Sequence, residues 1–103
     1  MTDNHLEALF AQMLKGITEL VNGEGGNNRI KMVSVDACGN AVRVELLDRN
    51  RNFLLSLVDE IRESAAQWRV NPFSSIVYEG NNVLSFNLKP IEEIEHLYSQ
   101  NSL

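Results

Sequence analysis

The sequence predicts an α+β fold: a four-stranded antiparallel sheet with helices mainly on one face, built in the order α-ββ-α-ββ-α. An amphipathic segment of helical period occupies residues 53–68 at the centre of the chain, and a pair of alternating segments lies on either side of it. Two further helical patterns lie near the ends. Because each helix has an apolar stripe to bury, the apolar face of a sheet is the expected packing surface.

The central helix is predicted from Phe53 to Trp68 because its apolar residues recur at steps of three and four. Either Asp48 or Asn50 can accept a backbone N–H as its N-cap. The pair Asn71-Pro72 marks its end, since the residue before a proline is pushed toward extended backbone. Its apolar stripe consists of Phe53, Leu54, Leu57, Val58, Ile61, Ala65 and Trp68.

The first helix is predicted from Asn4 to Val21, with Asn4 and Glu7 spaced like a capping box and Asn22-Gly23 at its end. Gly16 lies inside it at a cost of roughly 1 kcal/mol relative to alanine, which suggests that another backbone comes close. Residues 23–28 follow a helix and lead into a strand, the reverse of a phosphate-binding loop, so we interpret them as a flexible loop.

Two hairpins are predicted to turn at Gly-Asn pairs, whose residues tolerate positive φ. The first spans residues 29–47 and turns at Gly39-Asn40, and its first strand, Ile30 to Val35, alternates less cleanly than its second. The second pairs residues 75–78 with 83–88 through Gly80-Asn81. The side chains expected to face inward are Val42, Val44, Leu46, Leu84, Phe86 and Leu88, whereas Arg43, Glu45, Ser85 and Asn87 should face out.

The last helix should open at Pro90, with Glu92 and Glu93 near its positive end and a stripe that runs from Ile91 to Tyr98. The chain of 103 residues is expected to be one domain over residues 1–103, with residues 1–3 and 99–103 frayed.

The chain is acidic, with a formal net charge of −5 and a pI near 4.9. This charge disfavours unspecific binding to nucleic acid or anionic membranes. Cys38 is the only cysteine, which excludes an intramolecular disulfide. The first residues lack the basic charge of a signal peptide, and no apolar run approaches the length of a membrane span, so we expect a soluble cytoplasmic protein.

No constellation for catalysis, metal or cofactor emerges, so we expect no enzymatic activity and no cofactor. Glu93 and His96 have the E-x-x-H spacing of di-iron bundles, but a second such pair is missing. Cys38, near Asp36, needs a histidine to become a nucleophile, and His5 and His96 are both remote in sequence.

The acidic helix faces are the candidate surface for a partner protein, where negative charge steers a basic partner; simple solvation is the alternative. These residues are Asp59, Glu60 and Glu63 on the central helix and Glu92, Glu93 and Glu95 on the last. Three amphipathic helices exceed what one face of four strands covers. We therefore expect a homodimer through leftover apolar surface on the first helix or a sheet edge.

In element order, acidity and size the chain resembles the specialised chaperones of type III secretion systems, with one strand fewer in the first group. The matching stretches are residues 6–21, 29–47, 53–68, 75–88 and 91–98. The resemblance implies a dimeric chaperone of an effector protein. More broadly, we expect a non-enzymatic protein-binding module that acts as adaptor, chaperone or inhibitor.

The alternative is a small nucleic-acid-associated regulator that uses the arginine-rich middle, Arg29 to Arg69. Arg49 and Arg51 at one end of the central helix, and Trp68 and Arg69 at the other, offer groups that stack on bases. At ~1.5 Å per residue the two ends lie ~24 Å apart, so they form one patch only if a second subunit completes it.

Overall fold

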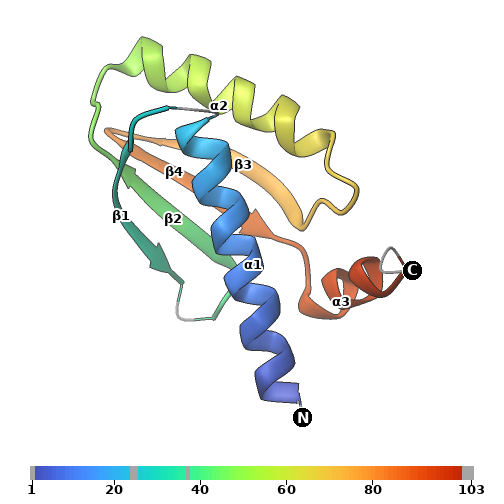
Figure 1. The fold of residues 1–103 in the computed structure, drawn as a ribbon. Coiled ribbons are helices and arrows are strands. Elements are labelled where there is room, and N and C mark those ends of the chain that lie inside the picture. Colours follow the sequence, from blue (N-terminus) through green and yellow to red (C-terminus); the bar gives the residue numbers. More distant parts are fainter. Residues whose placement is uncertain (1, 24–25, 37, 101–103) are drawn as a thin grey trace.

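The computed structural model describes residues 2–23, 26–36 and 38–100, with side chains from Glu7 onward. The described residues form three helices and a four-stranded sheet in the order α-β-β-α-β-β-α, which confirms the predicted α+β class; Figure 1 shows their arrangement. The elements are α1 (Thr2–Asn22), β1 (Ile30–Val35), β2 (Ala41–Leu46), α2 (Arg51–Ala66), β3 (Phe73–Gly80), β4 (Val83–Leu88) and α3 (Ile91–Gln100).

The strand order is β1-β2-β4-β3, and every neighbouring pair is antiparallel. The two hairpins therefore meet through β2 and β4, and β1 and β3 become the edges of the sheet. Val42 lies opposite Val35 on one side and Phe86 on the other. A register shift between Ile30 and Met32 accounts for the poor alternation of the first strand in the sequence.

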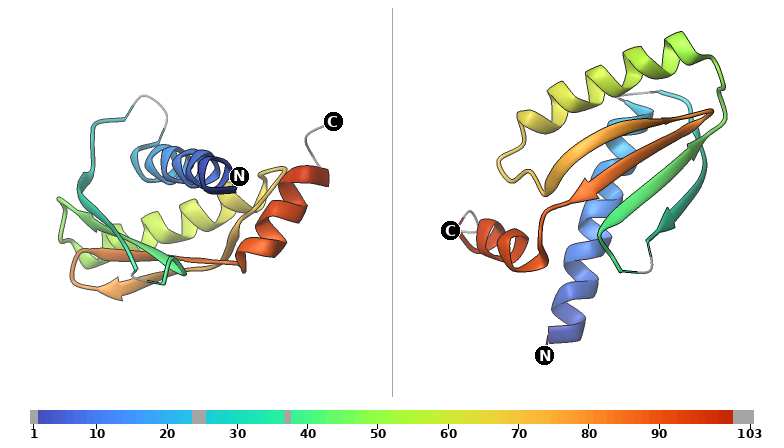
Figure 2. Two further views of the ribbon diagram at one scale, coloured as in Figure 1. Left: turned by 90° about the horizontal axis from the view of Figure 1, so that it is seen from below. Right: turned by 180° about the vertical axis from the view of Figure 1, so that it is seen from behind.

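Helices α1 and α2 cover the same face of the sheet, and the opposite face is left open (Figure 2). The core between these layers contains the predicted inward-facing valines and leucines of β2 and β4, together with Phe86. Helix α3 lies to the side and forms a small separate cluster, in which Ile94 packs with Leu9 and Met13 of α1. Two helices, and not three, therefore share the face of the sheet.

Helix α2 buries its apolar stripe against its own sheet: Leu54, Leu57, Val58, Ile61 and Ala65 are all buried. Asn50 is its N-cap, since the side chain accepts the Phe53 N–H at 3.1 Å, whereas Asp48 accepts the Asn50 N–H at 2.8 Å.

Helix α2 ends at Ala66 with Gln67 as its C-cap, two residues before the predicted Trp68, and so it stops before Pro72 as expected. Trp68 turns back onto the core, where its ring centroid lies 5.7 Å from that of Phe73. Trp68 therefore belongs to the segment that follows α2, and not to the helical stripe on which the sequence placed it.

Helix α1 begins at Thr2, so the predicted capping box with Asn4 as N-cap is wrong. Its C-terminal end is as expected: Gly23 has a φ of 73° and donates its N–H to Glu19 O at 2.9 Å. Arg29 holds the chain that returns from this end, since its Nη1 donates to Val21 O at 2.8 Å. Residues 24 and 25 of the predicted flexible loop lie outside the described residues.

The two turns differ from each other. Gly80 and Asn81 both have positive φ, at 100° and 52°, whereas in the first turn Gly39 does so at 72° and Asn40 does not. Ser85 lies on the open face, the side that the sequence predicted, but it is only 1% exposed. It is enclosed there because β4 is a central strand, with Arg43 and Val77 as the cross-strand neighbours of Ser85.

Helix α3 starts after Pro90, whose carbonyl accepts the Ile94 N–H at 3.1 Å, and it runs to Gln100, beyond the predicted Tyr98. Ile94 is buried, but Ile91 of the predicted stripe is 39% exposed. Of the residues expected to fray, 1 and 101–103 lie outside the described residues, and 2–3 and 99–100 are helical.

Candidate protein-binding surface

The β3 edge of the sheet is protected. Arg62 of α2 reaches over this edge and donates from Nε to Ile76 O at 2.8 Å. The register of β3 also shifts near both ends, between Phe73 and Ser75 and between Tyr78 and Gly80. Irregular pairing and a charged side chain over an outward carbonyl both hinder the addition of a further strand.

The β1 edge has outward-pointing backbone groups at Val33 and Val35. The Asp36 N–H donates to Ala41 O at 2.9 Å across the first hairpin. Because hydrogen-bonded pairs alternate along an antiparallel ladder, Ser34 and Met32 also bond to β2. The backbone groups of Val33 and Val35 then point away from the sheet.

The pairing of β2 with β4 indicates independently that the backbone groups of Val33 and Val35 point away from the sheet. Leu88 donates to Asn40 O and Leu46 donates to Asn82 O, both at 2.8 Å. The same alternation directs the backbone groups of Val42 and Val44 toward β4 and leaves those of Arg43 and Glu45 for β1. Arg43 lies opposite Ser34 and Glu45 lies opposite Met32. Ser34 and Met32 are therefore the positions at which β1 is hydrogen-bonded to β2.

Three apolar side chains of β1 are exposed: Met32 at 55%, Val33 at 38% and Val35 at 43%. Val33 and Val35 lie opposite Val44 and Val42, which are completely buried. The helices therefore bury the valines of β2 but leave Val33 and Val35 of β1 exposed. We call Met32, Val33 and Val35, with the outward backbone groups of the two valines, the β1 edge.

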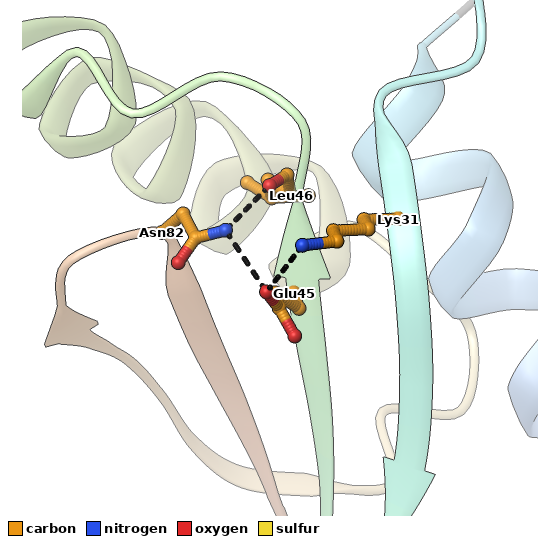
Figure 3. Close-up of polar contacts among 4 residues, drawn as sticks. All are labelled: Lys31, Glu45, Leu46 and Asn82. Atoms are coloured by element: carbon orange, nitrogen blue, oxygen red, sulfur yellow. Dashed lines mark hydrogen bonds and ion pairs between the residues drawn. The ribbon is translucent and has the colours of Figure 1, made fainter.

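A polar cluster holds the bulged end of β1 in place (Figure 3). Glu45 Oε2 lies 3.3 Å from Lys31 Nζ and accepts a hydrogen bond from Asn82 Nδ2 at 3.3 Å. Asn82 is 4% exposed, and its Nδ2 also donates to Leu46 O at 2.7 Å. The Asn82 hydrogen bond, and after it Lys31, lower the pKa of Glu45 below its ordinary value. The cluster connects β1, β2 and the β3-β4 turn through one ion pair and two hydrogen bonds. These contacts fix the position of the strand that carries the β1 edge.

Sequence reasoning missed this cluster. The contact between Lys31 and Glu45 depends on the register shift between Ile30 and Met32, because the ladder pairs Glu45 with Met32 and a regular strand would point Lys31 to the other face of the sheet. The position of Asn82 depends on the contact between two hairpins, for which the sequence carries no local signal.

The acidic candidates form two separate surfaces. Asp59, Glu60 and Glu63 are exposed on α2, where Asp59 Oδ1 pairs with Nη1 of Arg62, three residues along the helix, at 3.4 Å. The other three are on α3, which lies well apart from α2 in Figure 1. There Glu92 and Glu93 are exposed and Glu95 is half-buried.

The candidates for base stacking lie at opposite ends of α2. Arg49 and Arg51 are exposed at its start, and Arg69 is exposed beyond its end. Trp68 is half-buried, with its ring packed against Phe73. The tertiary structure does not bring the four residues together.

The other polar candidates that the structure describes lie at the surface. Cys38 is a free, exposed thiol, and Glu93 and His96 are exposed on α3; the His5 side chain lies outside the described part of the chain. Within residues 7–23, 26–36 and 38–100, no group of three or more His, Cys, Asp or Glu is placed to hold a metal ion. None of the described helices has the length and apolar character needed to cross a membrane.

A hollow of about 750 Å³ opens at the start of α2 and includes Arg29, Arg49 and Phe53 in its lining. Arg29 is already engaged, because its guanidinium bonds to Val21 O and lies 5.5 Å from the centroid of the Phe53 ring. The guanidinium of Arg29 therefore has a structural role in this hollow.

The fold and its surface define a small α+β protein with one protected and one open sheet edge. Comparisons with family models, curated proteins and solved structures found no match to this chain.

Proposed function

We propose that this chain is a non-enzymatic, dimeric protein-binding module of the cytoplasm that acts as an adaptor, chaperone or inhibitor of a partner protein. The observation that carries the proposal is the β1 edge. A strand with outward N–H and C=O groups and exposed apolar side chains is suited to association with another polypeptide.

The acidic face of α2 supports a basic partner. Asp59, Glu60 and Glu63 are all exposed, and within the described residues only Asp59 of the three has a cationic partner. Exposed carboxylates in excess over their cationic partners steer the encounter with a positively charged surface. We propose this face as the contact for the partner, and the shorter acidic group on α3 as a second contact.

Chaperone is the most specific of the three roles. It is supported by the order α-β-β-α-β-β-α, which parallels the layout of the type III secretion chaperones apart from one strand in the first group. An adaptor or inhibitor would use the same surfaces, so the identity of the bound protein decides among the three roles.

The test is capture from a lysate of the source organism on the immobilised chain, with and without nuclease. We expect a discrete protein that resists nuclease treatment and is lost from the Glu60→Lys/Glu63→Lys variant. The matched variant Glu92→Lys/Glu93→Lys reports whether α3 also contributes. Mass spectrometry of the captured protein then assigns the role.

The same experiment separates the nucleic-acid alternative. Replacement of Arg49 and Arg51 by alanine should leave capture intact, because these side chains lie at the start of α2, away from Glu60 and Glu63. Capture that disappears with nuclease, or with the two arginines, would contradict protein binding.

A further inference from the structure

We infer that the β1 edge is filled by a second copy of this chain, through antiparallel pairing of β1 with β1 about a two-fold axis at Ser34. The inference rests on the proposed function and deepens it, since it names the surface and the occupant of the dimer contact. It does not use the acidic face of α2, which stays available to a partner.

The backbone of β1 suits this pairing. The outward groups belong to Val33 and Val35, which lie symmetrically about Ser34. With the axis at Ser34, Val33 of one copy lies opposite Val35 of the other, and each such pair exchanges both N–H···O bonds. Ser34 faces its own equivalent in a pair without mutual hydrogen bonds, at a Cα separation of about 4.5 Å.

The side chains of β1 are complementary in the same register. Val33 and Val35, 38% and 43% exposed on the helix side of the sheet, cover the two valines of the other copy. Lys31 lies near one end of the strand and Asp36 directly follows the other. Antiparallel pairing therefore brings the lysine of each copy to the end at which the other copy has its aspartate.

A second copy suits the β1 edge better than an unrelated folded partner because of its symmetry. A two-fold contact closes both open edges at once, and leaves only the protected β3 edges at the ends of an eight-stranded sheet. One strand pair with three apolar side chains per copy falls short of the ~800 Å² per partner of a standard interface. We therefore expect dissociation at concentrations on the order of micromolar, not a permanent dimer.

Cysteine cross-linking tests the register directly. In a Cys38→Ser background, Ser34→Cys places a thiol on the axis, where a Cα separation of ~4.5 Å permits a disulfide. Met32→Cys is the matched control: the side chain is on the same strand and also exposed, but its equivalent in the second copy is four residues away along the pair. Under a glutathione redox buffer, the Ser34→Cys chain should form a covalent dimer at least tenfold faster.

A proline variant tests the backbone contact. The ladder directs the Val33 N–H away from β2, so Val33→Pro removes an intermolecular donor while the pairing of β1 with β2 remains. Sedimentation equilibrium should show at least a tenfold higher dissociation constant, with circular dichroism unchanged. Leu55→Ala on α2, where the side chain is 39% exposed, is the control and should leave the dimer intact. If Val33→Pro does not fold, Val35→Lys, which adds charge to the same edge, replaces it.

Three results would overturn the inference: a wild-type chain that stays monomeric at about a hundred times the expected dissociation constant, faster cross-linking of Met32→Cys, or a dimer that survives both edge variants. A nuclease-resistant partner captured by a monomeric chain would leave the proposed protein binding in place and remove only the β1 dimer. The converse, a β1 dimer without a captured partner, would remove the partner and keep the dimer.

Discussion

The indole of Trp68 lies directly over Gly16 of α1. A β-carbon at position 16 would approach Trp68 Cη2 to 2.7 Å. The ring has little freedom to withdraw, because it also packs at 5.7 Å from the Phe73 ring. The glycine therefore permits a close contact between α1 and the segment that follows α2. The sequence suggested a neighbouring backbone at this position, and the neighbour is a side chain.

Gly16→Ala should destabilise the fold, although alanine is the better helix former by roughly 1 kcal/mol. Overpacking against the indole costs about 1–3 kcal/mol, so we expect a net loss in the free energy of unfolding measured with urea. In a Trp68→Leu background the same substitution should cost much less, and the difference is the coupling energy of the pair. An equal cost in both backgrounds would show that the indole is not the obstacle.

Asn82→Ala should lower the free energy of unfolding by about 1–3 kcal/mol, because it removes a buried donor and leaves Leu46 O without this bond. The amide is 4% exposed and donates to Leu46 O at 2.7 Å. Asn27→Ala, at an exposed loop position, should change stability by less than about 0.5 kcal/mol. Equal effects of the two substitutions in urea unfolding would rule out a structural role for the polar cluster.

Glu45 should make stability depend on pH in the acid range. Its pKa in the folded chain lies below the ordinary value of 4.5, through Asn82 first and then Lys31. Because the folded-state pKa is depressed, the contribution is present above that ordinary value and is lost as pH falls through the folded-state pKa.

Urea unfolding of wild type and Glu45→Gln, measured from about pH 6 to about pH 3, should therefore show a shallower acid loss for the variant. Glu63→Gln, on the exposed side of α2, is the control and should follow the wild-type profile. A Glu45→Gln profile parallel to wild type would contradict the assignment.

Arg62→Ala should cost about 1–2 kcal/mol in urea unfolding, since its Nε donates to Ile76 O at 2.8 Å. Asp59→Ala removes only the exposed ion pair at 3.4 Å and should cost less than about 0.5 kcal/mol. If the two substitutions cost the same, the ion pair, and not the contact with the strand edge, carries the effect of Arg62.

The elements predicted well are those that depend on neighbours in sequence. The strands Ile30–Val35 and 83–88 have the predicted bounds, and the inward residues of β2 are buried as expected. Alternation and a turn glycine are local signals, so one hairpin can be read without the rest of the chain. The acidic residues of α2 were also predicted to be exposed, and they are.

The failures occur where distant segments meet. Trp68 was assigned to the central helix, but it lies two residues beyond the end of α2 and packs against Gly16 and Phe73, contacts that no local pattern predicts. Ser85 was expected to face solvent, but its strand lies in the middle of the sheet, so neighbours on both sides enclose it. The open β1 edge is of the same kind, because an edge exists only once the strand order is known.

The sequence by itself determined the α+β class, the order of the elements and the inward-facing residues of β2, since all three follow from periodicity and turn residues along the chain. Only the tertiary structure decided that the two hairpins join through β2 and β4, that Arg62 covers one edge, and that Val33 and Val35 are left open at the other. The physical reason is that strand order and edge protection depend on pairings between segments far apart in sequence. Their free energy is shared among many contacts and leaves no pattern in any single stretch.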